Sequence, residues 1–301
     1  MTTLALLFPG QGSQSVGMGR SLYDGSPAAR AVFDEADAVL GLPLTRLCFE
    51  GPEEELKSTA NTQPAILTHS IAALADLKSR FPERLEGVAF AAGHSLGEYS
   101  ADVAAGALAF ADALALVRRR GEFMQDAVPA GVGAMAAILG LSRPEVEAAC
   151  REAAEEEVVA PANFNSPEQT VIAGHAAAVT RACERCKERG AKRAIPLPVS
   201  APFHCSLMAP ARKRMEPLLA AARFSDPAWP VVTNVDAAPA ERGQALREAL
   251  VLQVDSPVRW VETVELLASR GVDRAIEIGP GNVLAGLVRR IAKGIAVEGH
   301  G

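Results

Sequence analysis

The sequence predicts an α/β fold in which a large domain with a parallel β-sheet carries a smaller inserted domain. Short apolar runs such as Leu4 to Phe8 alternate with segments whose apolar residues recur every three or four positions, and this alternation is typical of a parallel sheet covered by helices. Between Gly131 and Val199 the order of elements becomes β-α-β-β-α-β, the pattern of a ferredoxin-like unit. We therefore expect residues 1–130 and 200–301 to form the large domain and residues 131–199 the small one.

Composition and charge exclude several classes of protein. The 301 residues are 49% hydrophobic and 22% charged, which indicates neither disorder nor a membrane protein. The chain has no run of about 18 apolar residues, and its start lacks the basic and apolar regions of a signal peptide. We expect a cytoplasmic protein. The net charge of −6 argues against nucleic acid as the main partner.

The cysteines favour a reducing compartment, because they are odd in number and scattered along the chain. They are Cys48, Cys150, Cys183, Cys186 and Cys205. The CxxC pair, Cys183 and Cys186, lies inside the helical run from Ala176 to Arg189, whereas a redox CxxC needs a helix N-terminus to lower the thiol pKa. No second pair of ligands is spaced to complete a zinc site. We expect no metal.

A glycine-rich loop, PGQGSQSVGMG, follows the first strand and precedes a helix. It is not predicted to bind phosphate, because the GxGxxG spacing fails at Gln14 and Ser15 and no GK[ST] follows. Gln11 is the residue of interest in this loop. It is either a solvated loop side chain or a residue that lends a neighbouring backbone N–H group to an anion.

The next helix is expected to open at Pro64, after a polar stretch broken by Gly51 and Pro52. His69 lies on this helix. A single histidine at a helical position is more often packed or on the surface than a catalytic base.

The stretch GHSLG, Gly93 to Gly97, has the setting of a catalytic serine. An apolar strand precedes it, and Leu96 begins a helical repeat after it. A serine in such a strand–turn–helix is exposed beside free N–H groups at a helix N-terminus. Ser95 is therefore the candidate nucleophile of an α/β-hydrolase-like domain, with a plain turn as the alternative. The side chain of His94 leaves the turn in the opposite sense, so we expect it to orient a substrate or to pack rather than to transfer protons.

Arg120 lies on the most apolar face of the helix predicted from Ala111 to Val128. Arg118 and Arg119 project away from that face and need only water. A guanidinium on an apolar face requires an anion, which is either a structural carboxylate or a ligand. With Ser95 on the adjacent helix, the pattern favours a pocket for an acidic acyl group.

After the small domain, the stretch SAPFHCSLM contains the next candidate catalytic residues. Pro202, Phe203 and His204 form a tight loop before a helix, and His204 is the candidate base. His175 follows a strand of the small unit, and His300 is expected in a tail. The final third supplies further strands, helices and the turn GPGN before the last helix.

Eight stretches together resemble the malonyl-CoA:acyl carrier protein transacylase family. They cover nearly the whole chain in family order: FPGQGSQ, TQPAIL, GHSLGEYSA, RRRGEFMQ, NFNSPEQTVIAG, VSAPFHCSLM, QVDSPVRW and EIGPGNVLAGL. The resemblance implies that Ser95 accepts the acyl group and that His204 is its general base and acid. It further implies that Gln11 and Leu96 donate backbone N–H groups to the oxyanion, and that Arg120 binds the malonyl carboxylate.

The resemblance also implies how the pocket is lined. His94 and Asn163 would lie at the substrate, and Phe203 would fill the space that a branched acyl group needs. The backbone carbonyl of Gln253 would orient the histidine, so no triad aspartate is expected. Cys205 departs from the serine that is usual after the histidine, which leaves the local hydrogen bonding open.

The implied reaction moves malonyl from malonyl-CoA to the phosphopantetheine thiol of acyl carrier protein in fatty acid biosynthesis, through a malonyl-serine and with no bound cofactor. The alternatives are a malonyl loading enzyme of a polyketide assembly line, a serine esterase or thioesterase, and a scaffold with an inactive serine. Carrier proteins are acidic, so docking needs a local basic patch. Two clusters are candidates, unless they are simply solvated helix ends: Lys187, Arg189, Lys192 and Arg193, or Arg289, Arg290 and Lys293.

Overall fold

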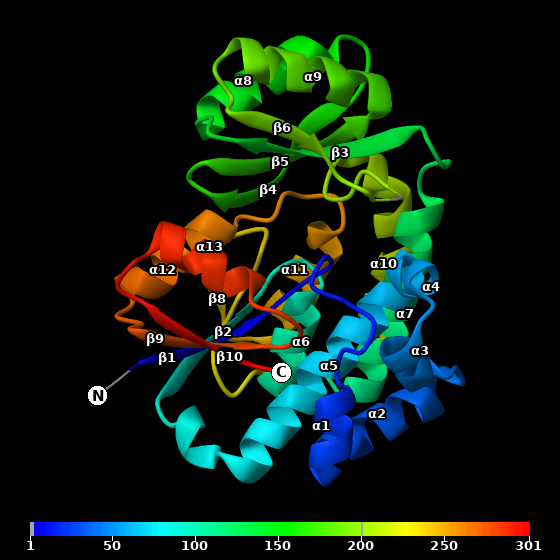
Figure 1. Ribbon diagram of the computed structural model, residues 1–301, viewed down its shortest axis with the longest axis vertical. Helices are drawn as coiled ribbons and strands as arrows, with labels where there is room; N and C mark the ends of the chain where they lie inside the picture. The colour runs from blue at the N-terminus through cyan, green and yellow to red at the C-terminus, as the bar shows by residue number, and fades with distance from the viewer. Residues whose placement is uncertain (1–2, 200) are drawn as a thin grey trace.

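The computed structural model describes residues 3–199 and 201–301 and shows a larger body below a smaller one (Figure 1). The larger body contains a six-stranded sheet and the smaller one a four-stranded sheet. No helix in the described part of the chain is long and apolar enough to cross a membrane.

The six-stranded sheet has the order β10-β9-β1-β2-β7-β8. All of its neighbouring pairs are parallel except β7 with β8, which confirms the predicted α/β class. Leu4 and Leu6 of β1 face one side of the sheet, and Ala5 and Leu7 face the other. Both faces are buried, which explains the unbroken apolar run. The strands are β1 (Leu4–Phe8), β2 (Val88–Gly93), β7 (Val231–Val232), β8 (Pro239–Ala240), β9 (Arg274–Ile278) and β10 (Ala296–His300).

Helices cover both faces of this sheet. On one face lie α1 (Arg20–Gly25), α2 (Pro27–Leu40), α5 (Thr59–Arg80) and α6 (Gly97–Ala104), and on the other α12 (Trp260–Ser269) and α13 (Val283–Ile291). A further cluster extends from α5 to the small sheet. It includes α3 (Leu44–Glu50), α4 (Glu53–Lys57), α7 (Phe110–Asp126), α10 (Ala209–Ala221) and α11 (Gly243–Gln253), while short 3-10 turns span η1 (Pro82–Leu85) and η2 (Ser206–Met208).

Helix α5 begins at Thr59 and contains Pro64, so the prediction that Pro64 opens the helix is wrong. Proline cannot donate to the carbonyl four residues earlier, here that of Ala60. The guanidinium of Arg118 donates to this carbonyl at 3.0 Å, which satisfies the acceptor and lets the helix continue. The prediction that Arg118 needs only water is therefore also wrong.

The last strand is an edge strand that the sequence analysis did not predict. β10 pairs with β9 in parallel register, and the His300 ring nitrogen Nε2 lies 3.0 Å from a carboxylate oxygen of Asp76. The expectation that His300 lies in a tail is wrong. β10 is stabilised mainly by backbone pairing with β9 rather than by burial of its side chains, so its sequence lacks the apolar run that would predict a strand.

The four-stranded sheet has the order β4-β5-β3-β6, and its pairs are antiparallel. Its elements are β3 (Gly133–Leu139), α8 (Arg143–Ala154), β4 (Val159–Ser166), β5 (Gln169–His175), α9 (Ala176–Glu188) and β6 (Arg193–Pro196), in the predicted β-α-β-β-α-β order. Helices α8 and α9 pack on one face. Met135 and Val171 on the other face join the core cluster of the larger body. The domain boundaries at 130/131 and 199/200 stay a prediction.

Candidate active site

Ser95 occupies a strained turn between β2 and α6. Its φ is 52°, in the left-handed region that non-glycine residues rarely adopt. The turn is also tightly enclosed. A Cβ on Gly93 would lie 1.9 Å from the Gly97 carbonyl, and one on Gly97 would lie 2.0 Å from the Phe8 carbonyl. The two glycines of GHSLG are therefore required by contact with neighbouring backbone, and the turn presents the Ser95 hydroxyl at the end of the strand.

The imidazole of His204 is held in the tautomer that suits a general base. Its Nε2 lies 2.7 Å from Ser95 Oγ, and its Nδ1 lies 3.0 Å from the Gln253 carbonyl and 3.2 Å from the Ser256 carbonyl. Because carbonyl oxygens only accept hydrogen bonds, Nδ1 carries the hydrogen and Nε2 accepts the hydroxyl proton. Burial and the charge of Arg120 lower the pKa of His204 to about 3, so the ring is neutral at physiological pH.

Two backbone amides beside Ser95 are free to bind an anion. The Ser95 amide is not one of them, because it donates to Asn234 Oδ1 at 2.7 Å. The amides of Gln11 and Leu96 have no hydrogen-bond partner among the described residues. Leu96 immediately precedes α6, where a helix N-terminus favours negative charge. These two amides are therefore candidate donors to an oxyanion formed at Ser95, and their role stays a prediction.

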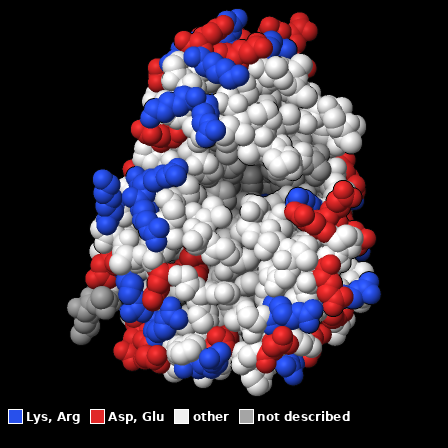
Figure 2. Space-filling model, in the orientation of Figure 1, with Lys and Arg blue, Asp and Glu red and all other residues white. Residues whose placement is uncertain are grey.

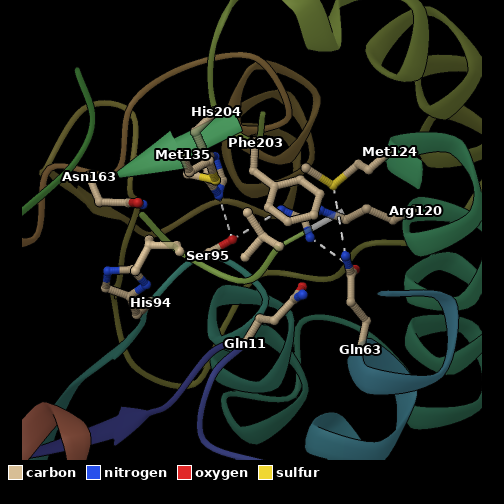
Figure 3. A pocket seen from close by; sticks show the side chains of 12 residues that line it. Gln11, Gln63, His94, Ser95, Arg120, Met124, Met135, Asn163, Phe203 and His204 are labelled. Carbon is tan, nitrogen blue, oxygen red and sulfur yellow. Dashed lines mark hydrogen bonds between the residues drawn. The ribbon is translucent and has the colours of Figure 1, made fainter. Parts of the chain in front are cut away.

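Arg120 is buried beside the serine and forms no ion pair with a described residue. It is only 1% exposed, and its guanidinium donates to Gln63 Oε1 at 2.9 Å and Gln253 Oε1 at 2.8 Å. It also reaches Ser95 Oγ at 3.3 Å (Figure 3). Burial lowers the pKa of Arg120, while Tyr99 and Glu98 raise it. The hydrogen-bond acceptors of Arg120 in the described chain are neutral oxygens, so the structural salt bridge considered from the sequence is not formed there. Burying a charge with only neutral hydrogen-bond partners is costly.

These side chains face a cavity of about 110 Å³ between the two bodies. Figure 2 shows the surface hollowed in this region. Phe203, His94 and Asn163 line the cavity together with the catalytic candidates. Its wall is otherwise largely apolar, with Met124, Met135, Leu197 and Val199. The site therefore combines a paired serine and histidine, free amides and a buried cation in one pocket.

Comparison with known proteins identifies the family. Residues 5–297 match the acyl transferase domain model. The malonyl CoA-acyl carrier protein transacylase of Escherichia coli (strain K12) is 53% identical over 293 residues, which cover 97% of this chain and 93% of that protein. The chain belongs to the malonyl-CoA:acyl carrier protein transacylase family. The transacylase of Bacillus subtilis is 51% identical, with 97% and 91% coverage.

Solved transacylase structures share the fold over almost the full length. An acyl carrier protein S-malonyltransferase from Vibrio cholerae superposes with a TM-score of 0.95 at 48% identity, covering 99% of this chain and 96% of that one. A malonyl-transacylase in complex with a type II polyketide synthase acyl-carrier protein superposes with a TM-score of 0.96 at 47% identity, with the same coverage.

His94 lies in the transacylase pocket but does not reach the serine hydroxyl. Its Nε2 lies 2.7 Å from Asn165 Oδ1, and its ring packs against Trp260 with centroids 5.6 Å apart. Burial lowers the pKa of His94. These contacts favour packing and substrate orientation over proton transfer.

Cys205 keeps a hydrogen bond despite replacing the serine usual in transacylases. Its thiol donates to the Pro202 carbonyl at 3.1 Å, and burial raises the thiol pKa to about 11. The thiol is therefore neutral at physiological pH. The substitution leaves no buried polar group unpaired at this position.

Gln63, Glu98, Asn234 and Ser256 were not identified from the sequence as residues of the transacylase site, and Gln253 was identified only through its backbone carbonyl. Gln63 and the amide of Gln253 hold Arg120, Asn234 holds the Ser95 amide, and the Ser256 carbonyl holds His204. Glu98 joins them as a buried carboxylate hydrogen-bonded to Gln253 and Asn234. Polar residues inside otherwise apolar helices were the available signal, namely Gln63 in TQPAIL and Glu98 three residues after Ser95.

Proposed function

We propose that the chain transfers a malonyl group from malonyl-CoA to the phosphopantetheine thiol of acyl carrier protein in fatty acid biosynthesis, through a malonyl ester of Ser95. The observation that carries this proposal is the buried guanidinium of Arg120, which faces the serine and forms no ion pair within residues 3–199 and 201–301. A malonyl carboxylate would supply the missing charge through paired N–H bonds. The expected cytoplasmic location is part of the proposal.

Acylation begins with attack of Ser95 Oγ on the thioester carbonyl, while His204 Nε2 takes the hydroxyl proton. The negative charge that develops on the carbonyl oxygen is stabilised by the amides of Gln11 and Leu96, at roughly 3 kcal/mol for each donor in related enzymes. The C–S bond then breaks, and the departing CoA sulfur takes the proton from His204. The Gln253 and Ser256 carbonyls stabilise the transient imidazolium.

Transfer to the carrier reverses these steps with a different thiol. His204 takes the proton of the phosphopantetheine thiol, whose sulfur attacks the malonyl ester. The ester C–O bond breaks, and Ser95 regains its proton from His204. Water competes with the thiol for the ester, and the apolar wall around Phe203 and Met135 limits its access.

For carrier docking we favour the basic cluster at the C-terminal end of α13, formed by Arg289, Arg290 and, two residues beyond the helix, Lys293. Its members are exposed, and none forms an ion pair with a described residue. In the other cluster, Arg189 pairs with Glu152 and Lys192 lies 3.7 Å from Glu168. The first residue of α13, Val283, lines a second cavity that includes Gln11 and His94. Figure 2 shows Lys and Arg gathered over the region of α12 and α13.

The test is intact-mass measurement after incubation with malonyl-CoA, followed by addition of a purified carrier protein. We expect one malonyl group on the protein, none on the Ser95→Ala variant, and transfer to the carrier faster than release as free malonate. Rapid loss to water with no carrier product would support the hydrolase alternative. A carrier from fatty acid synthesis and one from a polyketide synthase, compared in parallel, separate the two transferase alternatives.

A further inference from the structure

The side-chain amide of Gln253 links the Arg120 guanidinium to the Ser95 turn. Its Oε1 accepts a hydrogen bond from the Arg120 guanidinium at 2.8 Å. Its Nε2 donates to the Ser95 carbonyl and to Glu98 Oε2, each at 2.9 Å. The same residue supplies, through its backbone carbonyl, an acceptor for His204 Nδ1. The orientation of this one amide therefore affects the cation that faces the substrate.

Glu98 and the Ser95 carbonyl together determine which way that amide points, because both accept hydrogen bonds from its Nε2. Burial raises the pKa of Glu98 to about 7. Its Oε2 receives two N–H groups and is therefore an acceptor in either protonation state, so it requires the NH₂ end of Gln253 to face it. The carbonyl end must then face Arg120. In the flipped orientation, the NH₂ group would face the guanidinium, which has only donors, and Oε1 would face the carboxylate. The contacts with Arg120, Glu98 and the Ser95 carbonyl would all be lost.

Packing alone does not explain why a glutamate is buried at position 98. It lies in α6, its side chain is fully buried, and Oε2 also accepts from the Asn234 amide at 2.9 Å. Oε1 has no hydrogen-bond partner in the described chain. Burying a carboxylate without a contacting cation costs several kcal/mol, and this cost is offset by the two Oε2 hydrogen bonds and by the charge of Arg120.

We infer that Glu98 is a positioning residue that fixes the Gln253 amide, holds the Arg120 guanidinium toward the acyl pocket, and thereby sets the preference for a carboxylated acyl group over a neutral one. The inference rests on the proposed function. Glu98 touches no substrate, and its effect passes through Gln253 to Arg120. A purely structural role in supporting the Ser95 turn would instead affect charged and neutral acyl groups equally.

Two substitutions separate these roles. Glu98→Met has a similar volume but removes the acceptor, whereas the amide oxygen of Glu98→Gln can accept both hydrogen bonds that Oε2 receives. The readout is the ratio of kcat/KM for malonyl-CoA to that for acetyl-CoA. We expect Glu98→Met to lower this ratio by about tenfold or more, mainly through a higher KM for malonyl-CoA, and Glu98→Gln to change it by less than about threefold.

Asp102→Asn is the matched control, because Asp102 is the other buried carboxylate of α6 and its oxygens have no hydrogen-bond partner in the described chain. We expect its ratio to equal that of the unmodified protein. If Glu98→Met does not fold, Gln253→Met carries the same test, since it removes the amide and keeps the backbone carbonyl. We expect Gln253→Met also to lower the ratio of kcat/KM for malonyl-CoA to that for acetyl-CoA.

The outcomes are distinct. An unchanged ratio in Glu98→Met or Gln253→Met overturns the inference, as does a loss in Glu98→Gln as large as that in Glu98→Met. If the unmodified protein does not prefer malonyl-CoA, the proposed function fails and the inference fails with it. If that preference is present and the variants keep it, only the inference fails.

Discussion

The guanidinium of Arg120 lies 3.3 Å from the hydroxyl oxygen of Ser95, and both line the same cavity. The guanidinium is therefore close enough to contact the far end of a short acyl group attached to Ser95. The hydrogen-bond acceptors of Arg120 in the described chain are neutral oxygens of Gln63, Gln253 and Ser95. The cation therefore remains available to an anionic substrate, and its removal is the most direct test of substrate choice.

Substitution Arg120→Ala should reduce malonyl transfer by about a hundredfold, because a charge-assisted contact of roughly 3 kcal/mol is lost. Acetyl transfer should fall far less, so the variant gains relative tolerance for acetyl-CoA. Steady-state kcat/KM with both thioesters measures the effect. Arg119→Ala is the control on the same helix, because Arg119 is exposed and pairs with Glu122. Equal loss with both thioesters would show that Arg120 is structural.

Substitution His204→Ala should slow acylation of Ser95 by about 10² to 10⁴-fold, the usual contribution of a positioned general base. Rapid-quench mass measurement of the malonyl-protein gives this rate directly. His175→Ala is the control, because that ring lies in the small body and accepts from the Val158 amide. Acylation of the His204 variant at the unmodified rate would assign the proton transfer to another group.

The catalytic candidates were predictable because each is marked by a local pattern. Gly93 and Gly97 enclose the serine turn, and their spacing is visible in the sequence. Arg120 was marked by its place on an apolar helix face, and the structure buries it. The sheet was predictable for a similar reason, since β1 is an apolar run buried on both faces.

The supporting residues were not predictable because their roles arise from contacts between distant segments. Asn234 meets the Ser95 amide across 139 positions, and Gln253 meets Arg120 across 133. Gln253 was identified only through its backbone carbonyl, in the motif QVDSPVRW, and no local pattern marks its side chain or Asn234. The same holds for α5, where Arg118 completes the helix around Pro64 from another element, and for β10, which depends on pairing with β9.

Substitution Phe203→Ala should increase the use of methylmalonyl-CoA relative to malonyl-CoA. The Phe203 side chain is 7% exposed and lines the acyl cavity, so its removal leaves room for a branch. One methyl group in an apolar pocket changes selectivity by about 10-fold to 200-fold in other enzymes. Competition between the two thioesters, read by mass, measures the ratio. An unchanged ratio would mean that another side chain limits the branch.

Stability should fall as the pH drops below 6.5, in part because of His69. Burial lowers the pKa of His69 from 6.5 to about 4, and its ring nitrogens have no hydrogen-bond partner in the described chain. Between these pH values the unfolded chain binds a proton that the folded chain does not, so the free energy of unfolding falls. From pH 7.5 to 5.5 the loss from one such histidine is about 1.4 kcal/mol.

Urea titrations at the two pH values measure this loss for the unmodified protein and for His69→Leu. The variant should lose about 1.4 kcal/mol less than the unmodified protein over this range. His204 has a similarly lowered pKa and remains in both proteins, so it cancels in the comparison. An equal loss in the two proteins would remove His69 as a cause.

Charge reversal at Arg290 should weaken carrier binding without slowing acylation by malonyl-CoA. Arg290 lies in the last turn of α13, outside the acyl cavity, and an acidic carrier would meet it at the surface. We expect Arg290→Glu to raise the KM for the carrier several-fold at low salt and less at high salt, because exposed charges are screened. Lys187→Glu, from the other cluster and near the end of α9, is the matched control and should leave the carrier KM near its original value. The opposite pattern would place docking on α9, and an effect on the malonyl-CoA half-reaction would mean that the substitution disturbs the pocket itself.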